Sequence, residues 1–247
     1  MHYLLRVALS ASLLLIISSQ PPLHAEYLAT QSIAKDLERA LNKKDISTLK
    51  AIAPEEDGLN LASRYKILLG IFPNANWEIK EVNHLKNGRE ILKVSLTGNK
   101  VIKGEKYTLE AIQLIRIKTL GNKIIEKEVL DEQAIIQNSA SPLSISINVP
   151  SAVLTGTTYD FDIILNKPLG ETMIIGGLIP ITTEQIKRQV SPPIELAPLG
   201  GGGLFKSVKA PLQPGVQNWA ALIAHPKGLI SITKMVRIVE LESEIKL

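Results

Sequence analysis

The sequence predicts an α+β N-terminal half followed by an all-β C-terminal half. Between residues 33 and 72, apolar residues recur at helical spacing, and between residues 77 and 136 they alternate at strand spacing. Beyond residue 142 no useful helical period remains, and short apolar runs are separated by proline and glycine. The composition shifts at the same place, because residues 142–247 hold ten of the fourteen prolines and ten of the sixteen glycines.

The first 25 residues have the pattern of a signal peptide. Arg6 gives a basic start, Val7–Ile17 is apolar, and the segment ends in a small residue, Ala25. The rival interpretation is an uncleaved anchor, but the apolar run is shorter than the roughly 20 residues that span a bilayer. We therefore expect cleavage after Ala25, no membrane span in the mature chain, and export to a periplasm, a lumen or the extracellular space. The absence of cysteine and of a glycosylation sequon favours a bacterial source.

Charge and residue types exclude several classes of function. The net charge of +4 is modest and its excess is spread along the chain, so we expect no nucleic-acid partner. After loss of the signal peptide only His84 and His225 remain, in separate halves and without clustered acids. We therefore expect no metal site and no cofactor.

The N-terminal half reads as three helices and then an antiparallel meander of four strands. The opening helix carries a stripe that ends at Leu41, Asp45 can cap the second helix, and Tyr65 lies on the apolar stripe of the third. Asn87-Gly88 and Gly121-Asn122 are hairpin signals. The predicted strands are Trp77–Leu85, Ile91–Thr97, Tyr107–Lys118 and Lys123–Ile136.

The strand Tyr107–Lys118 is apolar on both faces. Side chains alternate across a strand, so Ile112 and Leu114 lie opposite the set Leu109, Ala111, Ile115 and Ile117. Helices cover one face only, so the second face needs another cover. The two candidates are a second copy, giving a homodimer through this sheet, and the C-terminal half folding back.

The C-terminal half reads as about seven short strands, with a helical turn at Glu184–Val190 and a flexible loop at Gly200–Gly203. The expected strands are 144–149, 157–165, 172–181, 194–197, 204–209, 217–224 and 229–239. The predicted domains are therefore a signal peptide (1–25), an α+β domain (26–141) and a β-sandwich (142–247), with the boundary at Asn138–Pro142.

Residues 30–137 resemble the nuclear transport factor 2-like superfamily, which includes ketosteroid isomerase and scytalone dehydratase. The resemblance is carried by the opening helix through Leu41, by Lys43–Ile46, by Phe72–Trp77, and by Gly121–Ile125 at the start of the last strand. It implies a cystatin-like, cone-shaped fold of helices on a curved antiparallel sheet. The family hosts isomerases, dehydratases and non-catalytic binding proteins. Residues 142–247 resemble an immunoglobulin-like β-sandwich in strand count, without its Cys–Trp–Cys pattern.

Three residues are candidates for the carboxylate and hydroxyl of an isomerase-like site: Tyr65, Glu110 and Asp131. Tyr65 can equally be a core tyrosine, and Glu110 can pair with Lys93 or Lys127 across the sheet. Asp131 and Glu132 read as a solvated strand edge. With Tyr65 and Glu110, Trp77 is a candidate for lining the cone pocket.

The leading hypothesis from the sequence is an exported, non-catalytic binding or assembly protein of a bacterial envelope or lumen. Its partner would be a protein or a small apolar ligand. The alternative is a small-molecule isomerase or lyase that uses Glu110 with Tyr65 in the cone pocket.

Overall fold

The computed structural model describes residues 30–53, 61–85, 89–140, 143–167, 172–200, 202–226 and 228–245. Four features predicted from the sequence lie wholly or partly outside these ranges. They are the signal peptide, the Asn87-Gly88 turn, Pro142 of the predicted boundary and Gly201 of the glycine loop.

Three helices open the described chain where the apolar periodicity predicts them. Asp45 caps the second, since its carboxylate accepts hydrogen bonds from Thr48 N at 3.0 Å and from the hydroxyls of Ser47 and Thr48. These bonds favour the charged form and lower the pKa of Asp45 to about 2. No described helix has the length and apolar character needed to cross a bilayer. The helices are α2 (Thr30–Lys43), α3 (Ile46–Ile52) and α4 (Leu61–Ile71).

Four long strands follow and pair with their neighbours as an antiparallel meander. They are β1 (Asn76–Leu85), β2 (Arg89–Ile102), β3 (Glu105–Leu120) and β4 (Lys123–Asn138). The described part of the chain beyond β4 adds eight more strands and one α-helix. These are β5 (Ile145–Asn148), β6 (Ala152–Leu154), β7 (Thr158–Leu165), β8 (Ile175–Ile181), α5 (Thr183–Arg188), β9 (Ala197–Pro198), β10 (Gly203–Lys209), β11 (Gly215–His225) and β12 (Gly228–Val239). A 3₁₀ turn, η2 (Glu242–Glu244), follows β12.

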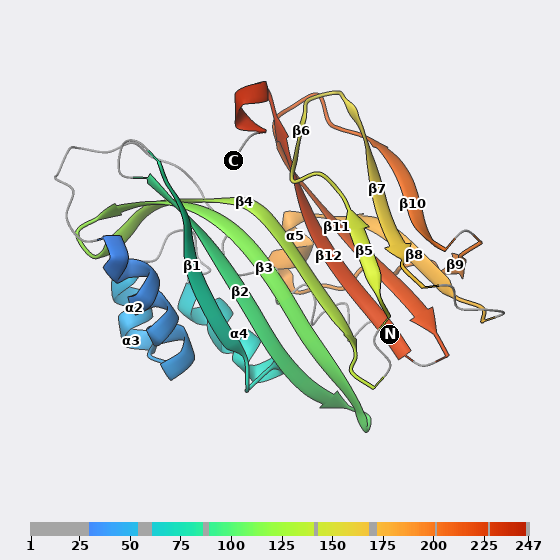
Figure 1. Cartoon of the computed structure of the whole chain (residues 1–247), viewed down its shortest axis with the longest axis horizontal. Coiled ribbons are helices and arrows are strands. Elements are labelled where there is room, and N and C mark those ends of the chain that lie inside the picture. The colour runs from blue at the N-terminus through green and yellow to red at the C-terminus, as the bar shows by residue number, and fades with distance from the viewer. Residues whose placement is uncertain are drawn as a thin grey trace.

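The predicted fold class, an α+β helix-on-sheet domain followed by a separate β-sandwich, is wrong. The structure is mostly β, with 57% of its residues in strands and 18% in helices, and the described part of the chain has only four short α-helices. One nine-stranded sheet runs in the order β1-β2-β3-β4-β12-β11-β8-β9, with β6 also paired to β12 (Figure 1). Residue 142 falls between β4 and β5, and this sheet contains strands from both sides of it.

The pairing of β12 with β4 is the physical reason for this difference. The two strands pair antiparallel from Ile230↔Gln137 to Lys234↔Gln133. Gly228 permits the approach, because its φ is +147° and a Cβ there would lie 2.7 Å from the Cβ of Asn138. Strand β12 therefore occupies the edge that a separate N-terminal domain would leave open.

The register shows that the four described α-helices lie on one face of the large sheet. Side chains directly opposite each other in an antiparallel ladder share a face, and Ala134 lies opposite Thr233, which lies opposite Ala220. Ala134 belongs to the core under α2, α3 and α4, and Ala220 belongs to the core under α5. The opposite face of β11 and β12 packs against the three-stranded sheet β10-β7-β5, seen in front of the red strands in Figure 1.

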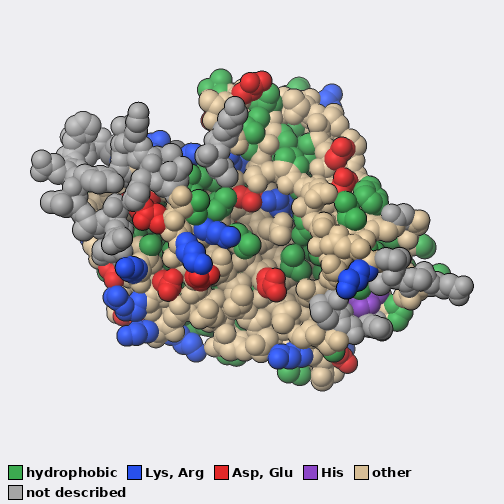
Figure 2. Space-filling view, in the orientation of Figure 1, with side chains coloured by type: hydrophobic (Ala, Val, Ile, Leu, Met, Phe, Trp, Pro, Cys, Tyr) green, Lys and Arg blue, Asp and Glu red, His purple; other side chains and the backbone are tan. Residues whose placement is uncertain are grey.

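The core beneath the three-stranded sheet includes Ile135 of β4 but no described residue of β1–β3, whose second face is largely polar. Ile112 on this face is 41% exposed, so the expected apolar cover is absent from the described residues of this chain. Figure 2 shows basic and acidic side chains interspersed there. The ion pairs of the face include Arg116–Glu128 at 2.6 Å and Lys118–Glu126 at 3.2 Å.

Side chains of α2 cap the outer edge of the sheet at β1. Asn42 accepts from Trp77 N at 2.9 Å and donates to Trp77 O at 2.8 Å. Glu38 accepts from Ile79 N at 2.7 Å. These backbone groups would otherwise be open to pairing with another chain.

Candidate ligand-binding cavity

Tyr65 is a core residue of α4. Its ring is fully buried, its hydroxyl donates to Leu41 O, and its centroid lies 5.1 Å from that of Trp77. Burial raises the pKa of the Tyr65 hydroxyl. Tyr65 and Trp77 are therefore brought together as packing partners, with the hydroxyl already engaged.

Glu110 lies on the other side of the sheet. Its register partners are Thr97 and Ile135, on the exposed face away from α4. The side chain is exposed, and the described residues contain no ion pair between Glu110 and Lys93 or Lys127. The fold thus separates Glu110 from Tyr65 by the thickness of the sheet.

The interior beneath α2 has little space for a ligand. A cavity of about 30 Å³ lies among Trp77, Leu92 and Ile115. This volume is close to the share of one water molecule in the liquid. The predicted cone pocket is therefore filled by side chains in the part of the chain that the structure describes.

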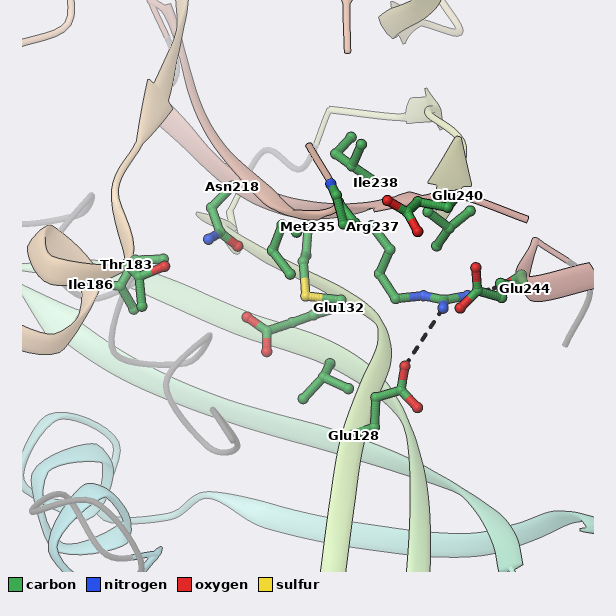
Figure 3. A pocket seen from close by; sticks show the side chains of 15 residues that line it. Glu128, Glu132, Thr183, Ile186, Asn218, Met235, Arg237, Ile238, Glu240 and Glu244 are labelled. Carbon is green, nitrogen blue, oxygen red and sulfur yellow. Dashed lines mark hydrogen bonds and ion pairs between the residues drawn. The ribbon is translucent and has the colours of Figure 1, made fainter. Parts of the chain in front are cut away.

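The larger cavity has a volume of about 460 Å³ and lies where β4 and β12 part (Figure 3). After the pair Gln133↔Lys234 the two strands separate, and β6 takes the place of β4 beside β12 from Arg237 onward. The β3–β4 ladder has a register shift here, because Leu114 pairs with Asp131 but Ile115 pairs with Val129. Such an irregularity bends the strand that carries the extra residue, which is β4. The divergence of β4 from β12 opens the cavity.

Apolar side chains form much of its wall. Met235 and Ile238 come from β12, Val216 from β11 and Ile186 from α5. A capping box formed by Thr182 and Gln185 fixes the start of α5 and so the position of Ile186.

Arg237 crosses the cavity as a buried cation that is 6% exposed. Its Nε donates to Leu130 O at 3.0 Å and its Nη2 to Glu244 O at 2.9 Å, while Nη1 lies 3.7 Å from Glu128 Oε1. Burial lowers the pKa of the guanidinium and Glu128 opposes that shift. An arginine remains charged in proteins in spite of such shifts.

Two acidic residues of β4 are not the solvated edge that the sequence suggests. Glu132 is 7% exposed, lines the cavity and accepts a hydrogen bond from Gln113 Nε2. Asp131 accepts from Lys234 Nζ across the β4–β12 junction, so it is part of an ion pair that joins the two strands.

The cavity and its charged residues were missed in the sequence because they depend on the pairing of distant strands. Arg237 has one local signal, since it stands alone as a cation in the apolar run Met235–Val239. The side chain of His84 lies outside the described residues, and His225 ends β11 opposite Gly228. Among the described residues, no group of three or more histidine, aspartate or glutamate side chains could hold a metal ion.

The C-terminal half is similar to a known family. A search of curated proteins found no match to the chain. The resemblance of residues 30–137 to the nuclear transport factor 2-like superfamily stays a prediction, whereas the family match lies in the other half. Residues 140–239, which include α5, β11 and β12 of the cavity wall, match the model of a family described as a domain of unknown function (DUF8623).

Proposed function

We propose that this chain is an exported, non-catalytic binding protein of a bacterial envelope or lumen. Its ligand site is the cavity between β4, β12 and α5. The observation that carries the proposal is the cavity itself, whose volume of about 460 Å³ lies within the range of small-molecule sites. A mostly apolar wall with a few buried charged groups is also typical of such sites.

The alternative of an isomerase or lyase has no comparable support. That chemistry requires Glu110 and Tyr65 to face one substrate, and they lie on opposite sides of the sheet. In the cavity, Arg237 is held by two backbone carbonyl oxygens and Glu132 by Gln113. These contacts suit binding, because they fix the charged groups in place.

The proposed location rests on residues 1–25 and is tested separately from the ligand site. N-terminal sequencing of the protein isolated from its own host should begin at Glu26 or within a few residues of it. An intact Met1 would refute export without bearing on the cavity.

The ligand site is tested by filling the cavity. Val216 lines it and is 50% exposed, so Val216→Trp places a large side chain there with little disturbance of the core. Val101→Trp is the matched control, because Val101 is 63% exposed on β2 and does not line the cavity.

Both tagged variants and the wild type are recovered from the envelope of the native host, and the small molecules released on denaturation are compared by mass spectrometry. A compound carried by the wild type and by Val101→Trp should be missing from Val216→Trp. A compound retained equally by all three proteins, or no enriched compound at all, would refute the cavity as the ligand site.

A homodimer through the exposed face of β1–β4 is a separate proposal about assembly. The exposed Ile112 and the interspersed charges of that face support only a small apolar contact. The α2 caps at Trp77 and Ile79 already occupy part of the β1 edge. Light scattering that gives the mass of a single chain would refute the dimer.

A further inference from the structure

The charges around the cavity favour a cation. Glu128, Glu132, Glu240 and Glu244 line it, and Arg237 is the one cation among its described lining residues. Glu128 is also paired with Arg116 at 2.6 Å, which offsets one of the four negative charges. With both arginines counted, the described carboxylates still exceed the cations by two. This excess of carboxylates among the lining residues favours a positively charged ligand.

Arg237 shows that the cavity also has hydrogen-bond donors to offer. A guanidinium has five N–H donors, and the structure supplies acceptors at hydrogen-bond distance to two of them, one on Nε and one on Nη2. The nearest carboxylate oxygen to Nη1 is 3.7 Å away, beyond hydrogen-bond distance. Three donors of a nearly fully buried side chain thus lie at the cavity without an acceptor among the described residues.

Glu132 and Arg237 face the same space from neighbouring strands. Glu132 is one residue beyond the last β4–β12 pair, and Arg237 is three residues beyond it on the other strand. Figure 3 shows both side chains among those that line the cavity, with Met235 between their backbones. Both groups are therefore available to one ligand in the cavity, and Met235 and Ile186 belong to the apolar part of the same wall.

We propose that the ligand is a compact aliphatic amine that carries a neutral oxygen acceptor, a carbonyl or a hydroxyl, close to its ammonium group. This inference rests on the proposed function. The ammonium lies at Glu132, and the oxygen accepts from Nη1 of Arg237. An anionic ligand would also suit Arg237, but it would have to enter beside Glu128, Glu240 and Glu244.

Four compounds that share an isobutyl group test this assignment. L-leucinamide has both the ammonium and the carbonyl, 4-methylpentanamide lacks the ammonium, 3-methylbutylamine lacks the carbonyl, and 4-methylpentanoate is an anion. Binding to the whole protein is measured by calorimetry and NMR titration at about pH 6.5, where an α-amino group is protonated. L-leucinamide should bind about tenfold or more tightly than each of the other three.

Glu132→Gln supplies the matching test on the protein. Glutamine keeps an oxygen that can accept from Gln113 while it removes the charge, so the fold should be retained. In this variant L-leucinamide should lose its advantage over 4-methylpentanamide. Glu110→Gln is the control, since Glu110 is exposed on the opposite face, and the advantage should be unchanged.

The outcomes separate this inference from the proposed function. If 4-methylpentanamide or 4-methylpentanoate binds as tightly as L-leucinamide, the ligand class is overturned while the cavity remains a ligand site. If none of the four compounds binds, the proposed ligand class is overturned. Whether the cavity is a ligand site is then decided by the comparison of Val216→Trp with Val101→Trp. An advantage of L-leucinamide that survives in Glu132→Gln would overturn the role of Glu132.

Discussion

The pairing of β4 with β12 predicts that the two halves of the chain unfold as one unit. Ile232 is the residue that tests this most directly. It is fully buried in β12, it lies opposite Ile135 of β4, and it packs in the core between the large and the small sheet. Ile232→Ala therefore removes apolar contacts at the junction of the halves without adding a polar group.

The expected loss follows from the burial of the side chain. Truncation of a fully buried isoleucine to alanine lowers the free energy of unfolding by about 2–5 kcal/mol. For a chain of this size each kcal/mol corresponds to roughly 2–4 °C in the melting temperature. The same change at Ile112, which is 41% exposed on the same sheet, should lower the free energy of unfolding by less than about 1 kcal/mol.

The two tryptophans of the protein make the assay specific to each half. Trp77 lies in β1 and Trp219 in β11, and both are buried, at 1% and 3% exposure. Trp77→Phe leaves Trp219 as the reporter of the C-terminal half, and Trp219→Phe leaves Trp77. Urea unfolding followed by fluorescence then gives a midpoint for each half.

The midpoints are compared within each single-tryptophan background. Ile232→Ala should shift the Trp77 midpoint and the Trp219 midpoint by similar amounts, and each curve should show one transition. A Trp77 midpoint that does not respond to Ile232→Ala would show that β1–β4 unfold independently. The nine-stranded sheet would then not be a cooperative unit.

Three further changes test local features of the fold. The pKa of Asp45 in the folded protein is about 2, below its ordinary value of 3.8. The contribution of the Asp45 cap to the free energy of unfolding is therefore complete above pH 3.8 and is lost as the pH falls towards 2. When the midpoint of urea unfolding is plotted against pH, Asp45→Asn should show a smaller change over this range than the wild type. Two parallel curves would contradict a stabilising role for the Asp45 carboxylate. Tyr159→Phe removes the acceptor of Trp219 Nε1 and should cost about 1–3 kcal/mol of unfolding free energy, an effect that should shrink in Trp219→Phe. Gly228→Ala should lower the melting temperature because its Cβ would clash with Asn138, whereas Gly70→Ala, with nothing within 4 Å, should not.

Much of the local structure could be predicted from the sequence, because each element is encoded by its own spacing of apolar residues. The helices containing Leu41 and Tyr65 and the strands on either side of Gly121-Asn122 are where those patterns place them. The three-residue strand β6 is too short to give a pattern and was missed. The architecture was predicted wrongly because the composition shift near residue 142 suggested a division that strand pairing crosses.

The cavity could not be predicted for the same reason. Its two principal charged residues are far apart in the sequence, and neither belongs to a recognisable motif. Glu132 resembles any acidic strand residue until β12 lies beside it, and its burial depends on that neighbour. Glu110 was an equally plausible candidate from the sequence pattern, yet its strand register places it on the exposed face of the sheet.

The pairing of β12 with the distant strand β4 has a consequence for the order of folding. The ion pair between Asp131 and Lys234 joins residues 103 positions apart, so the centre of the large sheet closes only when residues up to Lys234 are present. Contacts of such long range slow folding, because loop-closure entropy is lost before the contact forms. Until Gly228–Val239 emerges during synthesis or translocation, the facing edges of β4 and β11 both lack this partner. A chain that stops short of Gly228 would therefore present two open strand edges at once and be prone to aggregate.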